Sequence, residues 1–137
     1  MDITIKEYTP VEMEPLLALY ASVGWVNYTR NPAMLANAVR HSLTLLGAFD
    51  GDRLVGILRA VGDGFSVVYI QDIIVLPEYQ RNGIGRRLLH AVDALYPHVY
   101  QKVLLTDRQP HTLQFYESCG YAPSTQRDCV AFVKFSS

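Results

Sequence analysis

The segment YIQDIIVLPEYQRNGIGRRLL, residues 69–89, joins a nearly continuous apolar run to a helix across two closely spaced glycines. The apolar run that ends at Pro77 predicts a strand buried on both faces at the centre of a sheet. Beyond Gly85, apolar residues recur at helical spacing as far as Leu95, and Pro97 then stops the helix. The segment therefore predicts a central strand, a glycine turn and an amphipathic helix in direct succession.

The two glycines, Gly83 and Gly85, stand where that helix begins. A helix start exposes backbone N–H groups and a partial positive charge, which together bind phosphate. Glycine lets an oxygen approach backbone that a side chain would cover, and Arg81, Arg86 and Arg87 add positive charge. The stretch therefore predicts a diphosphate cradle. The alternative is a flexible helix entry with exposed arginines.

Two common glycine motifs are poor matches to this loop. A P-loop needs Lys and then Ser or Thr after its last glycine, whereas Gly85 is followed by two arginines. A dinucleotide fingerprint needs a third glycine where this chain has Leu88, and it normally follows the first strand of a βαβ unit. The pattern therefore disfavours both the nucleotide hydrolases and the dinucleotide-binding folds.

Hydrophobic periodicity on either side of this segment predicts a single α/β domain over residues 1–137. The expected sheet is mixed and mostly antiparallel, with six to seven strands and helices on both faces. A loop is expected at residues 25–30. Strands are expected at residues 3–8, 43–49, 53–61, 66–75, 102–106 and 129–135, and helices at residues 10–24, 31–42, 84–95 and 110–121.

Composition limits the classes of partner. The chain is 50% hydrophobic and 18% charged with a formal net charge of -1, so it lacks the basic excess that favours nucleic acid or anionic lipid. It has no signal-peptide pattern and no stretch long enough to cross a bilayer. Cys119 and Cys129 make neither a disulfide framework nor a zinc site, and the histidines show no metal spacing. We therefore expect a cytoplasmic protein without a metal or a nucleic-acid or membrane partner.

Two motifs together resemble the GNAT superfamily of acyl-CoA-dependent N-acyltransferases, in particular its small bacterial members. The first is Val75-Leu76-Pro77 followed by Gln80, Gly83 and Gly85, and the second is FYESCGY, residues 115–121. The expected order of strands and helices agrees with that family along essentially the whole chain. The resemblance implies a single GNAT-like fold and acetyl-CoA as the co-substrate.

The resemblance also implies where coenzyme A lies. Its diphosphate would lie on the N–H groups of the glycine loop, and its pantetheine arm would pair with the central strand like an added strand. Gln109 stands where many relatives carry an asparagine that contacts the cofactor, and its longer amide could reach the same ligand. The implied cofactor-binding residues are Ile73, Ile74, Val75, Gln80, Arg81, Asn82, Gly83, Gly85, Arg86 and Gln109.

Two residues are candidates for catalysis. Tyr116 matches the family tyrosine that faces the thioester sulfur as a general acid, although a core aromatic residue is the alternative. Freeing the lone pair of an alkyl ammonium at neutral pH costs about 4.6 kcal/mol, so a proton acceptor is useful. Asp72 is the only carboxylate in the central strand and shares a face with Ile70 and Ile74, which makes it either the base or a structural residue. Tyr69, Glu78, Asp107 or water are weaker substitutes.

Acceptor recognition is expected in the segment between the first two helices. Trp25 and Tyr28 would face a cation or ring of the acceptor, or else fill the core, and Arg30 would favour an acidic group.

The expected reaction is direct attack of a primary amine, most simply of a small molecule, on acetyl-CoA in a ternary complex. A non-catalytic acyl-CoA sensor and a protein lysine or N-terminal acetyltransferase are the alternatives. The resemblance also allows a homodimer.

Overall fold

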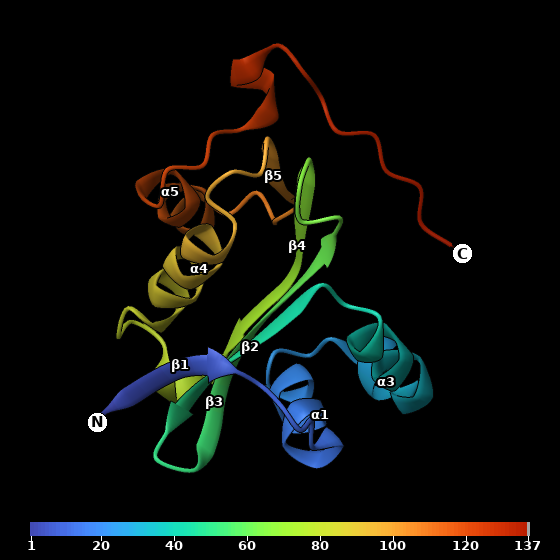
Figure 1. Ribbon diagram of the computed structural model, residues 1–137, viewed down its shortest axis with the longest axis vertical. Helices are drawn as coiled ribbons and strands as arrows, with labels where there is room; N and C mark the ends of the chain where they lie inside the picture. The colour runs from blue at the N-terminus through green and yellow to red at the C-terminus, as the bar shows by residue number, and fades with distance from the viewer. Residues whose placement is uncertain (137) are drawn as a thin grey trace. The chain divides into compact units, whose positions relative to one another are not determined.

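The computed structural model describes residues 1–136, which form two compact units that divide after Leu105 (Figure 1). The first unit holds a five-stranded sheet and four helices, and the second holds one helix and an extended carboxy-terminal segment. The elements of the first unit are β1 (Ile3–Glu7), α1 (Met13–Ser22), α2 (Val26–Thr29), α3 (Pro32–Arg40), β2 (Thr44–Asp50), β3 (Arg53–Gly62), β4 (Val67–Val75), the 3-10 turn η1 (Pro77–Tyr79), α4 (Ile84–Leu95) and β5 (Gln101–Leu104). Those of the second are α5 (Pro110–Ser118) and the 3-10 turn η2 (Ser124–Arg127).

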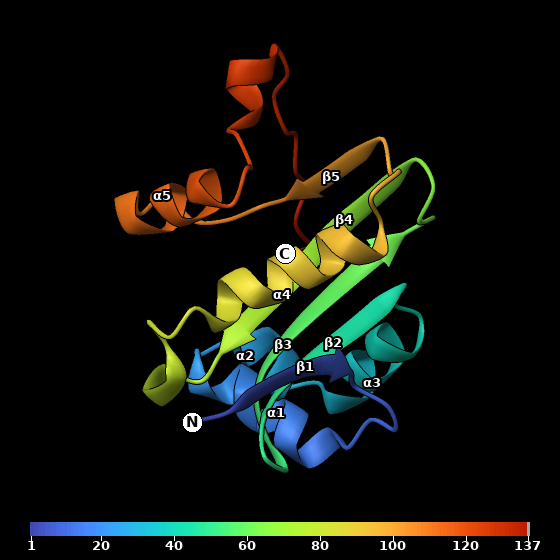
Figure 2. The same ribbon diagram turned by 60° about the vertical axis from the view of Figure 1, so that its left-hand side comes forward.

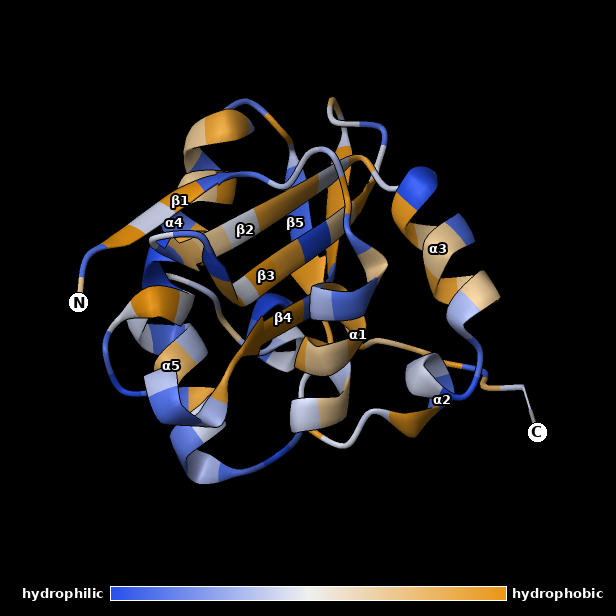
Figure 3. Ribbon diagram, turned by 90° about the horizontal axis from the view of Figure 1, so that it is seen from below, coloured by the Kyte–Doolittle hydropathy of each residue, from blue (hydrophilic) through white to orange (hydrophobic). Residues whose placement is uncertain are grey.

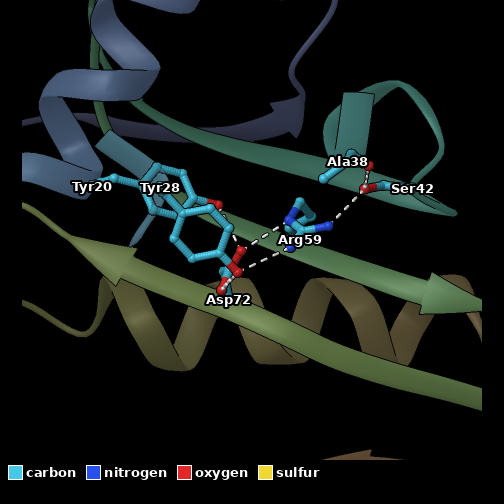
Figure 4. A network of polar contacts seen from close by, with 6 residues as sticks. All are labelled: Tyr20, Tyr28, Ala38, Ser42, Arg59 and Asp72. Carbon is cyan, nitrogen blue, oxygen red and sulfur yellow. Dashed lines mark hydrogen bonds and ion pairs between the residues drawn. The ribbon is translucent and has the colours of Figure 1, made fainter. Parts of the chain in front are cut away.

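The sheet of the first unit has the order β1-β2-β3-β4-β5, and only the pairing of β4 with β5 is parallel. The chain reaches β5 through α4, as a parallel connection requires. Helix α4 lies on one side of β3 and β4, and α1 lies on the other (Figures 1 and 4). Hydrophobic residues concentrate in β2, β3 and β4 (Figure 3). The predicted mixed, mostly antiparallel α/β sheet is therefore confirmed.

The predicted number of strands, six to seven, is wrong, because the sheet has five. The segment 129–135 was the expected last strand, yet it is extended and pairs with no strand among residues 1–136. Its alternating residues favour a strand, but a strand also needs a neighbouring edge to supply its hydrogen bonds. The expected loop at residues 25–30 also differs, since it contains the one-turn helix α2.

The central strand β4 is buried mainly on one face. Val68, Ile70, Asp72 and Ile74 are buried, whereas the residues between them are half-buried or exposed. The prediction that β4 is buried on both faces is therefore correct for one face only. An apolar run in the sequence does not indicate how completely the helices cover each face of the strand. On α4, the buried stripe is Ile84, Leu88, Leu89 and Val92, and Leu95 at the helix end is exposed.

The turn from β3 to β4 is tightly specified. The Asp63 carboxylate accepts hydrogen bonds from the backbone N–H groups of Phe65, Ser66 and Val67 at 2.7 to 3.1 Å. Gly62, at the end of β3, has φ of 134°, and a Cβ there would lie 2.4 Å from the Val67 carbonyl oxygen. Only glycine fits this position without moving the backbone of β4.

We expect Gly62→Ala to lower the free energy of unfolding by about 3 kcal/mol, because it adds a backbone clash to a strained φ. Gly51→Ala is the matched control: Gly51 also has positive φ, 61°, but a Cβ there meets nothing within 4 Å. Its cost should be that of the backbone strain alone, about 1 kcal/mol. Urea unfolding of both variants measures the difference, and equal costs would contradict the account of this turn.

Candidate active site

The loop that opens α4 has left-handed backbone and N–H groups that come before the first hydrogen bond of the helix. Gly83, the residue before the helix, is left-handed with φ of 76° and ψ of 10°, and Arg81 is also left-handed with φ of 67°. The Arg87 N–H donates to the Gly83 carbonyl at 3.0 Å, so the N–H groups of Gly83, Ile84 and Gly85 precede the hydrogen-bond ladder of the helix. Left-handed residues in such a turn direct successive N–H groups into a concavity that suits an anion.

The side chains of the loop hold its shape. The Asn82 amide donates to the carbonyls of Tyr79 at 3.1 Å and Gln80 at 3.2 Å. The Gln80 amide donates to the Val75 carbonyl at 3.1 Å and so ties the loop to the end of β4. Because these two amides bond to the protein itself, the groups that the loop offers to a ligand are chiefly its N–H groups and the exposed Arg81 side chain.

The sheet of the first unit opens beside this loop. Strand β5 ends at Leu104, opposite Ile70, while β4 continues to Val75 (Figure 2). Residues 71–75 of β4 therefore have a strand partner only on the β3 side within this unit. Their other backbone edge is a place where an extended ligand can form main-chain hydrogen bonds.

A buried polar network lies on the α1 side of β4 (Figure 4). Arg59 on β3 and Asp72 on β4 are 5% and 3% exposed, and the Arg59 Nε donates to the Asp72 Oδ2 at 2.9 Å. Asp72 also accepts from the hydroxyls of Tyr20 at 2.7 Å and Tyr28 at 3.2 Å. Arg59 donates as well to Ser42, whose hydroxyl donates to the Ala38 carbonyl of α3. The network thus ties β3 and β4 to α1, α2 and α3.

Each member of this network has its hydrogen bonds satisfied. Within residues 1–136, no buried side-chain nitrogen or oxygen lacks a partner. Burial, followed by the charge of Asp72, raises the pKa of both Tyr20 and Tyr28. Both tyrosines are therefore neutral donors at ordinary pH, and they help Arg59 to compensate the buried carboxylate.

The three candidate acceptor-binding residues occupy different settings. Tyr28 is buried and belongs to the Asp72 network. Trp25 is half-buried, and its ring lies 5.9 Å from that of Tyr20 and 6.4 Å from that of Tyr28, measured between centroids. Arg30, at the end of α2, is exposed. The structure therefore brings Trp25 and Tyr28 together beside Asp72, but not Arg30.

Sequence reasoning missed Tyr20, Arg59 and Ser42, which complete the network. Arg59 had a detectable signal, because it is the one charged residue inside the apolar run LVGILRAV of β3, just as Asp72 is in β4. Two opposite lone charges in adjacent strands predict a buried ion pair. Tyr20 and Ser42 carried no such signal, since a hydroxyl among apolar residues is common.

Tyr116 lies on α5 in the second unit, among aromatic neighbours of that unit. Its ring centroid is 5.1 Å from that of Phe115 and 6.4 Å from that of Tyr121. Burial raises the pKa of Tyr116 to about 12, and the nearby Cys119 and Asp107 act in the same direction. The hydroxyl is therefore protonated and able to donate a hydrogen bond throughout the physiological range.

Gln109 directly precedes α5 and is exposed, and its side chain makes no cap for that helix. Its backbone N–H donates to the Asp107 carboxylate at 2.9 Å.

Among residues 1–136 no cluster of three or more His, Cys, Asp or Glu side chains could hold a metal ion. In the same part of the chain, every helix is too short or too polar to span a bilayer.

Comparison with known proteins identifies the family. Residues 21–136 match the model of the acetyltransferase (GNAT) domain. An uncharacterized ycf52-like N-acetyltransferase of Prochlorococcus marinus is 30% identical over 128 residues, which are 89% of this chain and 67% of the relative. A GNAT-family acetyltransferase of Streptococcus pneumoniae has a solved structure that is 41% identical, with a TM-score of 0.89 and 98% of each chain covered.

A more distant structure shares the fold alone. The PaiA N-acetyltransferase of Thermoplasma acidophilum, solved in complex with coenzyme A, is 20% identical, with a TM-score of 0.71 over 86% of this chain and 88% of that one. The family match spans the first unit from the end of α1 onward and the whole described part of the second. The chain is therefore an acyltransferase enzyme that belongs to the GNAT family of N-acetyltransferases.

Proposed function

We propose that this enzyme transfers the acetyl group of acetyl-CoA to a primary amine of a small molecule, by direct attack within a ternary complex. The observation that supports this most strongly is the left-handed loop at the start of α4, whose N–H groups precede the helix ladder. A relative of the same fold was solved with coenzyme A. A net charge of -1 gives the enzyme little attraction for a strongly basic protein tail, which favours a small acceptor.

We propose a cytoplasmic location, because the two free cysteines are consistent with a reducing compartment.

In this proposal coenzyme A lies along the opening beside β4. The pantetheine arm pairs with the backbone edge of Ile73, Ile74 and Val75 that has no strand partner on the β5 side within the first unit. The diphosphate lies on the N–H groups of the α4 loop, where the helix dipole and the arginines offset its charge. Gln80 and Asn82 then act by holding the loop, since their amides bond to backbone carbonyls. The proposed cofactor-binding residues, which act by contact or by holding the loop, are Ile73, Ile74, Val75, Gln80, Arg81, Asn82, Gly83, Gly85, Arg86 and Gln109.

The proposed reaction is a single acyl transfer. The amine nitrogen forms a bond to the acetyl carbonyl carbon, the carbon–sulfur bond breaks, and the electron pair leaves on sulfur. Tyr116 donates a hydrogen bond or its proton to that thiolate, for which a neutral phenol is required. The proton that the amine loses passes to a base or to water.

Asp72 has two proposed roles, between which experiment decides. As a base, it would accept the proton of the amine. As a positioning residue, it would fix the Tyr28 hydroxyl and, through the packing of Tyr28, the ring of Trp25 beside the acceptor. We favour the positioning role, because Asp72 already accepts three hydrogen bonds in a buried ion pair. Trp25, Tyr28 and Arg30 are the proposed acceptor contacts.

Gly83→Leu should weaken coenzyme A binding by about 100-fold, because the side chain would cover the N–H groups that hold the diphosphate. Gly24→Leu is a closely matched control. Gly24 has φ of 75° against 76° for Gly83, and a Cβ at either position meets nothing within 4 Å. The two variants therefore place leucine at nearly the same left-handed φ. Titration calorimetry with coenzyme A measures both, and equal affinities for the two variants would refute the cradle.

Tyr116→Phe should lower kcat by about 100-fold with little change in KM for acetyl-CoA, because the lost hydroxyl acts on the departing thiolate. Tyr100→Phe, at an 88% exposed tyrosine, is the control and should leave kcat unchanged. Because the pKa of Tyr116 is about 12, its ionisation should remove no activity below about pH 11. Release of free thiol with a panel of amines is the assay, and no release with any amine would favour an acyl-CoA sensor.

Asp72→Asn should lower the free energy of unfolding by about 3 kcal/mol, because it leaves Arg59 buried without its counter-charge. A double-mutant cycle with Arg59→Met separates the pair from its surroundings, and a coupling of about 2 kcal/mol is expected. The pH–rate profile of any folded Asp72→Asn protein then tests the role. A positioning residue leaves the acidic limb of the profile in place. An unchanged stability with loss of that limb would show that Asp72 is the base.

A further inference from the structure

Asp50 and Arg53 flank the two-residue turn from β2 to β3 and are paired with each other in the ladder. Directly opposite residues of an antiparallel ladder point to the same face of the sheet, so both side chains leave the hairpin on one side. Both contact η1, the 3-10 turn that leads into the glycine loop. Neither side chain has a role in the acetyl transfer proposed above.

Tyr79, the last residue of η1, contacts both of these side chains. Its hydroxyl donates to the Asp50 Oδ2 at 2.6 Å, and the Arg53 guanidinium carbon lies 5.4 Å from the centre of its ring. The bond to Asp50 raises the pKa of Tyr79, so the hydroxyl remains a donor at ordinary pH. A hydroxyl that donates to a carboxylate makes a short and strong hydrogen bond. Tyr79 is therefore held to the hairpin by its side chain.

The other link between the hairpin and η1 is weaker. The Arg53 Nη2 lies 3.2 Å from the Glu78 Oε2, but the two side chains are 56% and 58% exposed. Water and salt screen such a pair, so it contributes little to holding η1. The bond between Tyr79 and Asp50 joins two half-buried residues, where screening is smaller. It is therefore the main restraint that the hairpin places on η1.

The main chain of Tyr79 carries this restraint into the loop. The Asn82 amide donates to the Tyr79 carbonyl at 3.1 Å, and Asn82 directly precedes the left-handed Gly83. The other side-chain bonds of the loop come from Gln80 and Asn82, which are both exposed, so water competes for them. The bond from Tyr79 to Asp50 is thus the one that ties the loop to β2, on the far side of β3 from β4.

We propose that Tyr79 is a positioning residue for the diphosphate of coenzyme A, and that it acts through its hydrogen bond to Asp50 at the end of β2. This inference rests on the proposed function of the loop that opens α4. Without the bond, the loop populates other shapes, and the apparent dissociation constant rises by the inverse of the fraction that stays competent. The pantetheine arm is unaffected, because its proposed partners lie in β4.

Tyr79→Phe tests the proposal, because it removes the hydroxyl and keeps the ring beside Arg53. Titration calorimetry should show coenzyme A binding weakened by about 10-fold, which corresponds to a competent fraction of about a tenth. The affinity for pantetheine should not change. In steady-state kinetics the KM for acetyl-CoA should rise by a similar factor while kcat stays the same, because the bond acts on binding and not on the chemical step.

Substitutions of Asp50 test whether Tyr79 acts through it. Asp50→Asn keeps an oxygen that accepts from the hydroxyl, so coenzyme A binding should weaken by less than about threefold. Asp50→Ala removes the acceptor and should reproduce the loss of about 10-fold seen with Tyr79→Phe. Asp50→Ala/Tyr79→Phe should lose no more than either single variant, because each removes the same bond. Losses that multiply in the double variant would overturn the proposal.

Tyr8→Phe is the matched control, because it also removes a bonded hydroxyl, which donates to the Glu12 carbonyl at 2.9 Å between β1 and α1. It should leave the affinities for coenzyme A and pantetheine unchanged. If Tyr79→Phe keeps the native affinity for coenzyme A, or weakens both ligands equally, Tyr79 is merely structural and the proposal is overturned alone. If the native protein binds no coenzyme A, the proposed function fails together with it.

Discussion

The left-handed backbone at Gly83 is the constraint on which the proposed function depends. Eight residues separate β4 from α4, and the first N–H groups of the helix make no bond within its ladder. The amides of Gln80 and Asn82 keep the loop in that shape by bonding to its own carbonyls and to the end of β4. Because the protein's own hydrogen bonds hold the loop, we expect binding to carry little ordering cost. The same strand supplies the free edge at residues 71–75.

The buried pair of Arg59 and Asp72 sets a second constraint, on the other side of β4. Such a pair adds little net stability compared with apolar residues of similar size, because both charges lose their hydration. Its value lies in the geometry that it requires: three helices and two strands must meet at one carboxylate and one guanidinium. That requirement fixes Tyr28, and with it the position of Trp25, where the proposed acceptor would lie. The proposed cofactor and acceptor regions are thus held by different interactions in the same unit.

Much of the fold could be predicted from the sequence because its signals are local. Three features each depend on neighbouring residues: the glycine turn, the apolar stripe on α4 and the cap of α3. In that cap the Asn31 side chain accepts a hydrogen bond from the Met34 N–H at 3.2 Å. The Arg59–Asp72 network joins residues that are far apart in the chain, and only the two lone charges pointed to it. The sixth strand failed for a different reason. Residues 129–135 have the alternating pattern of a strand, but a strand also needs a neighbouring edge, about which that pattern carries no information.

The comparison of coenzyme A with pantetheine in titration calorimetry tests the central claim most directly, because pantetheine keeps the extended arm and lacks the diphosphate. If the N–H groups at the start of α4 hold that diphosphate, coenzyme A should bind at least about 100-fold more tightly than pantetheine. The advantage should also decrease as salt is added, since part of it is electrostatic. Equal affinity for the two ligands, or no heat from coenzyme A at all, would contradict the account.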